Sequence, residues 1–170
     1  MFVYLNSNKL IMPGIRSKLR IFLLICIIFT FHSSCNNEEN DVIPDVLVDF
    51  YIDLNDPEFF ALNAIGNHVL VDSRTNNFGY KASGYDDNGI IVYRAQADEF
   101  IALDRTCPHD YVLNGSSIAV DVDGIYAECP ECESTYALPS FGTPTSGPSK
   151  YPLKMYRAVF TGQFVHVSNY

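Results

Sequence analysis

The sequence predicts an all-β domain of antiparallel strands, arranged as a barrel or a small sandwich, and three observations predict it. Short runs of β-branched and aromatic residues recur from about residue 47 onward. Ten glycines and nine prolines break the sequence between apolar runs, as turns do. The 170 residues are 48% hydrophobic and 14% aromatic, which excludes a disordered chain and allows a real core.

The expected elements follow in chain order. A strand is expected at 48–54, where apolar and polar residues alternate, and a short helix at 56–63 with Asn55 or Asp56 as its N-cap. Further strands are expected at 68–72, 89–94, 99–104, 117–123, 124–128, 155–160 and 163–167. Asp123-Gly124 and Thr161-Gly162 are the turns that we expect to close two hairpins.

The first 34 residues differ in composition, because they contain lysine and arginine but no acidic residue. Residues 21–31 form an apolar run that suits a signal peptide and is shorter than the ~20 residues of a membrane-spanning helix. The segment that follows, His32-Ser33-Ser34-Cys35, resembles the lipobox of bacterial lipoproteins. The resemblance implies a lipoprotein signal peptide at 1–34 and a lipid on Cys35. The alternatives for residues 21–31 are a short membrane anchor or a buried helix, and the alternative for Cys35 is ordinary signal cleavage that leaves it as a free thiol.

The rest of the chain divides into a flexible acidic tether at 35–46 and a folded domain at 47–168. The net charge of −9 argues against contact with a phosphate backbone, so no nucleic-acid partner is expected. With a lipid on Cys35, the domain would be anchored to a membrane of the bacterial cell envelope, in the periplasm or at the surface.

Two predicted strands each end in a loop that carries metal-ligating side chains. Cys107-Pro108-His109 follows one strand, and Cys129-Pro130-Glu131-Cys132 follows another. Three cysteines and one histidine form a four-ligand set for zinc or for an iron-sulfur centre. The proline after the first cysteine of each loop fixes φ and removes one backbone donor, which would shape the loop around a metal.

Three segments resemble the Rieske [2Fe-2S] family: EFIALDRTCPH its first loop, CPECESTY its second, and GPSKYPLKMYRAVFTGQFVHV its third loop and closing hairpin. The resemblance covers about 48–167. It implies a Rieske-like antiparallel β-barrel or sandwich with a small metal-binding subdomain of two ligand loops. Cys107 and Cys129 would hold one iron, and His109 and Cys132 the other. Residues that would shape the loops are Pro108, Pro130, Ser134, Gly147 and Pro148.

The resemblance implies a membrane-tethered Rieske-type electron-transfer protein, a ferredoxin-like component of an oxidoreductase system that serves a redox partner protein. The chain itself would be a carrier rather than a catalyst. Cys132 stands where the family has its second histidine, so the cluster would be more negative and its reduction potential lower. Three alternatives stay open: a non-redox envelope lipoprotein with a structural Cys₃His zinc site, a vestigial metal site, and a redox-sensing thiol pair, Cys129 and Cys132.

Overall fold

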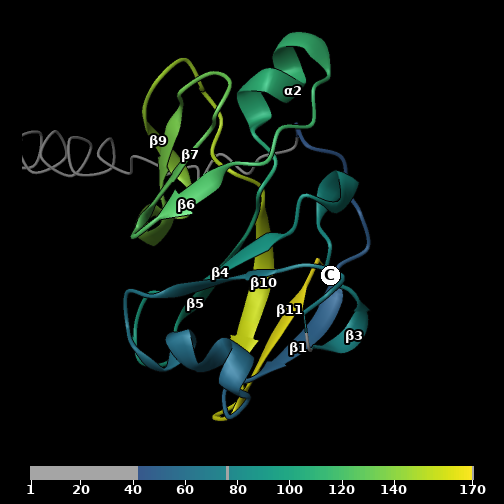
Figure 1. Ribbon diagram of the computed structural model, residues 1–170, viewed down its shortest axis with the longest axis vertical. Helices are drawn as coiled ribbons and strands as arrows, with labels where there is room; N and C mark the ends of the chain where they lie inside the picture. The colour runs from purple at the N-terminus through teal and green to yellow at the C-terminus, as the bar shows by residue number, and fades with distance from the viewer. Residues whose placement is uncertain (1–41, 76, 170) are drawn as a thin grey trace, which may run out of the picture. The chain divides into compact units, whose positions relative to one another are not determined.

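The computed structural model describes residues 42–75 and 77–169, and these residues form two antiparallel β-sheets (Figure 1). The large sheet has the strand order β2-β4-β5-β10-β11-β1-β3, and the small sheet has the order β6-β7-β8-β9. The strands of the large sheet are β1 (Asp49–Asp53), β2 (His68–Val71), β3 (Phe78–Lys81), β4 (Ile90–Arg94), β5 (Phe100–Asp104), β10 (Met155–Phe160) and β11 (Phe164–Ser168). Those of the small sheet are β6 (Asp121–Asp123), β7 (Tyr126–Glu128), β8 (Thr135–Ala137) and β9 (Thr143–Ser146).

Helices among the described residues are short. They are α2 (Pro108–Asn114) and the 3₁₀ helices η1 (Pro57–Asn63), η2 (Tyr85–Asp87) and η3 (Leu138–Ser140). Asp56 caps η1 by accepting a hydrogen bond from the backbone N–H of Glu58 at 2.9 Å. Across residues 42–75 and 77–169, none of the helices has the length and apolar character needed to cross a membrane.

The large sheet curls around one apolar core. Phe50 and Ile52 of β1 share this core with Val71 of β2, Val92 of β4 and Val167 of β11. Strands from both halves of the strand order therefore face the same interior. Burying a side chain of this size contributes about 1.5–3 kcal/mol, so this core accounts for much of the domain's stability.

Strands β4 and β5 are buried on both faces. Ile90 and Ala102 point into the core of the large sheet, while Ile91 and Leu103 belong to a second apolar cluster. The second cluster also contains Ala127, Tyr136, Leu138 and Leu153, together with Cys107 and Cys129. The small sheet thus packs against the outer face of β4 and β5, and the two cysteines lie within that contact. Figure 1 shows β6, β7 and β9 at the same end of the domain as α2.

The segment ahead of β1 is packed onto the domain. Ile43 is only 1% exposed. The ammonium group of Lys154 donates a hydrogen bond to the carbonyl of Ile43 at 2.9 Å and pairs with Asp45 at 2.7 Å. Asn169 donates to the carbonyl of Val46. The packed chain therefore begins a few residues before the predicted boundary at residue 47, and residues 35–41 of the predicted tether lie outside the described residues.

The all-β antiparallel class is confirmed, and so are the two hairpins predicted at Asp123-Gly124 and Thr161-Gly162. The range predicted as one strand at 117–123 is a strand only at Asp121–Asp123, with Ala119 forming an isolated bridge to Thr106. Strands β3, β8 and β9 and helix α2 were not expected from the sequence. The three strands are short and mix Gly, Pro, Ser and Thr with few apolar residues, so they carry little periodic signal.

Candidate metal site

The first cysteine loop is held in place by hydrogen bonds to a neighbouring segment. Cys107 donates its backbone N–H to the carbonyl of Ile118 at 2.8 Å, and Val120 donates to the carbonyl of Arg105 at 2.7 Å. The guanidinium group of Arg105 also donates to the carbonyl of Val120, at 2.9 and 3.1 Å. These contacts fix the position of Cys107 at the end of β5, where its side chain is fully buried.

Cys107 is the N-cap of helix α2, and Pro108 occupies the first helical position, where its missing N–H costs nothing. Gly115 ends the helix in the left-handed conformation, at φ 73°, as C-terminal glycines commonly do. The first ligand loop therefore continues as two turns of helix. Asp110, in the first turn, is buried beside Cys107.

The second loop brings two more cysteines to the same place. Cys129 follows β7 and is fully buried, whereas Cys132 is partly exposed. Cys129 donates its N–H to the carbonyl of Ser134 at 2.9 Å, and Glu133 donates to the carbonyl of Cys129 at 3.0 Å. Glu133 takes a positive φ of 58°, which closes this tight turn. Pro130 is exposed at its edge.

Ser134 connects the second loop to a third. Its hydroxyl oxygen accepts from the Cys132 thiol at 3.2 Å and from the backbone N–H of Ser149 at 3.0 Å. Gly147, at φ 82°, lies so close that a Cβ there would stand 2.5 Å from the Cα of Ser134. Pro148, next to it, is exposed. The third loop is thus pressed against the backbone of the second loop, which only a glycine at position 147 permits.

The structure gathers four potential ligands, and we call Cys107, Asp110, Cys129 and Cys132 the four-donor group. One donor atom from each lies within 4.8 Å of every other. The Cys129 thiol donates to Oδ2 of Asp110 at 2.9 Å, and Sγ of Cys107 lies 3.6 Å from Sγ of Cys132. His109 is half-buried and is not a member of this group. The assignment of His109 as a ligand stays a prediction.

Two residues at this site, Asp110 and Tyr136, were not assigned from the sequence as ligands or as loop-shaping residues. The sequence does contain a signal that could have identified Asp110. Pro108, directly after Cys107, and Gly115, seven residues later, are typical of the start and the end of a short helix. Helical spacing then places Asp110 on the same face as Cys107. Tyr136 is a fully buried residue of β8, and its hydroxyl lies 3.3 Å from Sγ of Cys107. Nothing in the local sequence marks that contact, since it joins residues 29 apart.

Burial sets the protonation of these groups. It raises the pKa of Cys107 to about 11, and it raises the pKa of Cys129 further, together with the hydrogen bond to Asp110. Burial also raises the pKa of Tyr136, and its contact with Cys107 adds to the rise. For Asp110, burial acts to raise the pKa, but hydrogen bonds from the three thiols outweigh it, so the pKa lies below the ordinary value. Without a cation the site therefore holds the Asp110 carboxylate beside the neutral thiols of Cys107 and Cys129.

The chemistry of the four-donor group fits a metal that prefers thiolate. The described cysteines are free thiols. A tetrahedral ion bound to sulfur at about 2.3 Å places neighbouring sulfurs about 3.8 Å apart, close to the 3.6 Å between Cys107 and Cys132. In a two-iron cluster, ligands of different irons lie farther apart than ligands of one ion. The compact spacing therefore fits a single ion as it stands, and a two-iron cluster requires the two loops to separate.

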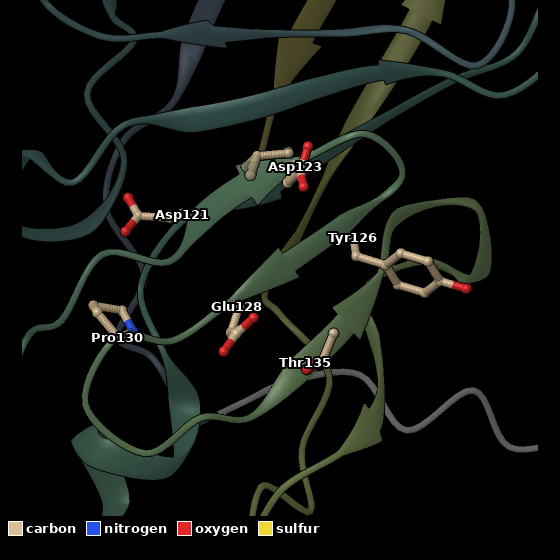
Figure 2. A pocket seen from close by; sticks show the side chains of 7 residues that line it. Asp121, Asp123, Tyr126, Glu128, Pro130 and Thr135 are labelled. Atoms are coloured by element: carbon tan, nitrogen blue, oxygen red, sulfur yellow. The ribbon is translucent and has the colours of Figure 1, made fainter.

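An acidic pocket adjoins the second loop (Figure 2). It has a volume of about 460 Å³ and lies on the small sheet, lined by Asp121, Val122, Asp123, Tyr126, Glu128, Pro130 and Thr135. Arg105 approaches Asp121 at 3.8 Å, but the Asp121 side chain is largely exposed. Three carboxylates therefore surround the pocket, next to the loop that carries Cys129 and Cys132.

Comparisons with known proteins found no matching family model and no matching curated protein. Among solved structures, the chain is similar to one in a complex of reduced oxygenase and oxidized ferredoxin in carbazole 1,9a-dioxygenase, at 23% identity and a TM-score of 0.40. That match covers 62% of this chain and 82% of the other. It is also similar to the ferredoxin of carbazole 1,9a-dioxygenase from Nocardioides aromaticivorans IC177, at 18% identity and a TM-score of 0.42. Here the match covers 74% of this chain and all of the other.

Proposed function

We propose that this chain is a one-electron carrier whose iron-sulfur centre is bound at the four-donor group. Two loops from different parts of the fold bring three free, mostly buried thiols together, and this observation carries the proposal. Soft thiolates are the donors that iron-sulfur centres use. The resemblance of the three loop segments to the Rieske family makes a [2Fe-2S] cluster the expected form. Such a cluster takes up and releases one electron without moving the protein's atoms far.

The exposure of the three thiols supports exchange of electrons with another protein. Cys107 and Cys129 are fully buried, whereas Cys132 is partly exposed between the exposed side chains of Glu131 and Glu133. A centre bound here would be shielded from water on most sides and would approach the surface at Cys132. We therefore propose that electrons enter and leave at this edge.

The test is to isolate the protein from its native envelope without air and to measure its metal and its spectra. We expect two irons and two acid-labile sulfides per chain, a visible absorption spectrum, and an EPR signal on reduction. A Cys129→Ser variant should lose the iron, while Cys26→Ser, which changes only the predicted signal segment, should retain it. One zinc per chain, or no metal, would disprove the electron carrier.

A structural zinc site is the second candidate, and the compact spacing favours it. The four donors lie within 4.8 Å of one another, as ligands of one tetrahedral ion do. In this role the metal would join the two loops, and the domain would serve as a non-redox binding module. Zinc in the native protein, with no reducible centre, is the result that selects this candidate.

We propose that the redox partner presents a basic surface to the acidic pocket. Asp121, Asp123 and Glu128 form a negative field beside the second loop. In stopped-flow measurements, oxidation of the reduced protein by a small cationic complex should be faster than by an anionic one, and salt should reduce the difference. Replacing these three carboxylates by their amides should remove most of the difference in rate between the two complexes. Replacing Asp86, Asp87 and Asp98, which are exposed on other segments, should not.

We also propose that the protein is anchored in the cell envelope by a lipid on Cys35, which lies outside the described residues. The lipobox-like segment ahead of Cys35 supports this. Labelled palmitate should be incorporated by the native chain and by Cys26→Ser, which changes only the predicted signal segment. It should be lost in Cys35→Ser. Labelling of Cys35→Ser at the native level would rule the anchor out.

A further inference from the structure

Helix α2 decides which residue of the first loop faces the other cysteines. Cys107 is its N-cap and Asp110 is its third helical residue, and this spacing places two side chains on the same face of a helix. His109 precedes Asp110 by one position, so its side chain leaves the helix about 100° away. The two side chains therefore point in different directions while the helix is intact.

The contacts of Asp110 show which of the two does so. Its carboxylate accepts from the Cys129 thiol at 2.9 Å, across a sequence separation of 19 residues. Its donor atom lies within 4.8 Å of all three sulfurs of the four-donor group, and no ligand atom of His109 belongs to that group. The first-loop donor that meets the second loop is therefore the carboxylate.

The burial of Asp110 indicates that a cation belongs beside it. Asp110 is only 6% exposed. The ion pairs found among residues 42–75 and 77–169 do not include Asp110. A buried carboxylate is costly unless a positive charge or hydrogen-bond donors compensate it, and in the metal-free protein the three thiols donate to it. When a metal binds, the thiols lose the protons that they donate, so a metal ion among the three sulfurs would then compensate the carboxylate.

We propose that Asp110, rather than His109, is the fourth ligand of the metal centre, so that the ligand pattern is Cys107-x-x-Asp110 followed by Cys129-x-x-Cys132. This inference rests on the proposed metal centre but holds for one ion or for a cluster. When a divalent ion binds, three thiols each release a proton to water, and three metal–sulfur bonds and one metal–oxygen bond form.

The test is a titration of the reduced, full-length chain with Co²⁺, in which the thiolate-to-cobalt charge-transfer band reports binding. Competition with a chelator gives the affinity. We expect Asp110→Ala to weaken Co²⁺ binding by about 100-fold or more, since losing even an outer-shell partner costs 10–100-fold. His109→Ala should stay within about threefold. Asp110→Cys should bind Co²⁺ with a stronger charge-transfer band, because a fourth thiolate joins the set.

The Asp110→Cys variant guards against a trivial loss of folding in Asp110→Ala, because it tests the same position by a gain of signal. The inference is overturned if His109→Ala loses binding while Asp110→Ala keeps it, if the Asp110→Cys band is unchanged, or if the native chain binds no Co²⁺. The proposed electron transfer fails separately, when native protein contains zinc. In that case the Co²⁺ titration still decides between Asp110 and His109.

Discussion

At the scale of single residues, Gly147 links the third loop to the metal site. Its φ of 82° and the close backbone of residues 133 and 134 leave no room for a Cβ. We predict that Gly147→Ala destabilises the protein by about 2–3 kcal/mol and displaces the second loop. Urea unfolding and the Co²⁺ affinity of the same samples measure the two effects.

The matched control is Gly162→Ala. Gly162 has a similar φ of 89°, but no atom lies within 4 Å of the position that a Cβ would occupy. This variant should lose only about 1 kcal/mol of stability, the cost of a positive φ for alanine, and it should keep its Co²⁺ affinity. Equal losses in the two variants would show that contact with the second loop does not matter.

Asp104, at the end of β5, ties the first cysteine loop to the large sheet. Its carboxylate accepts hydrogen bonds from the backbone N–H groups of Tyr85 and Thr106 and from the hydroxyl of Tyr156, at 2.7–2.8 Å. Burial, and then the charge of Asp104, raise the pKa of Tyr156, so its hydroxyl stays protonated and donates. We predict that Tyr156→Phe costs about 1.5–3 kcal/mol in urea unfolding. The exposed Tyr126, changed to Phe, should cost under about 0.5 kcal/mol, and equal costs would contradict the prediction.

At the scale of elements, the segment 43–46 depends on one buried lysine. Lys154 binds the carbonyl of Ile43 and the carboxylate of Asp45. Lys154→Met keeps most of the apolar stem but removes the hydrogen bond to Ile43 and the ion pair with Asp45, so we predict a loss of about 1–3 kcal/mol. Amide hydrogen exchange in 43–48 should become faster. Lys150→Met, on an exposed neighbour, should change neither quantity; identical exchange in both variants would refute the role of Lys154.

At the scale of the whole molecule, the metal-free protein should lose stability in alkali. The pKa of Cys107 is about 11 in the folded state, against an ordinary value of 9.0. Between these values the unfolded chain releases the thiol proton and the folded chain retains it. The unfolded state then binds fewer protons, so the free energy of unfolding falls as pH rises from about 9 to 11. Urea unfolding of the reduced, chelator-treated protein at several pH values measures this.

A Cys107→Ala variant serves as the comparison for this pH dependence, because it removes one of the groups that titrate. Its stability should decline less steeply between pH 9 and 11, even if its absolute stability is lower. Cys129, whose pKa burial also raises, contributes to the slope that remains. If the free energy of unfolding of the native chain stays constant or rises between pH 9 and 11, Cys107 is not a buried neutral thiol.

The local pattern of the sequence was enough to predict the all-β class, the two hairpins and the meeting of three cysteines. Alternation along β1 and the turns at Asp123-Gly124 and Thr161-Gly162 are short-range signals, so they need no knowledge of the rest of the fold. The hairpin at Asp123-Gly124 turns the chain back between the two cysteine loops, so it brings the loop of Cys129 and Cys132 toward Cys107.

Only the tertiary structure decided which face each buried residue of β4 and β5 occupies, and that the carboxylate of Asp110 lies among the three sulfurs. Four consecutive apolar residues in β4 show no alternation, so the second core behind them becomes visible only when the small sheet packs there. The choice between His109 and Asp110 depends on whether the first loop continues as a helix. That depends on long-range contacts, such as the hydrogen bond from Cys107 to Ile118, because a helix of seven residues is not stable by itself.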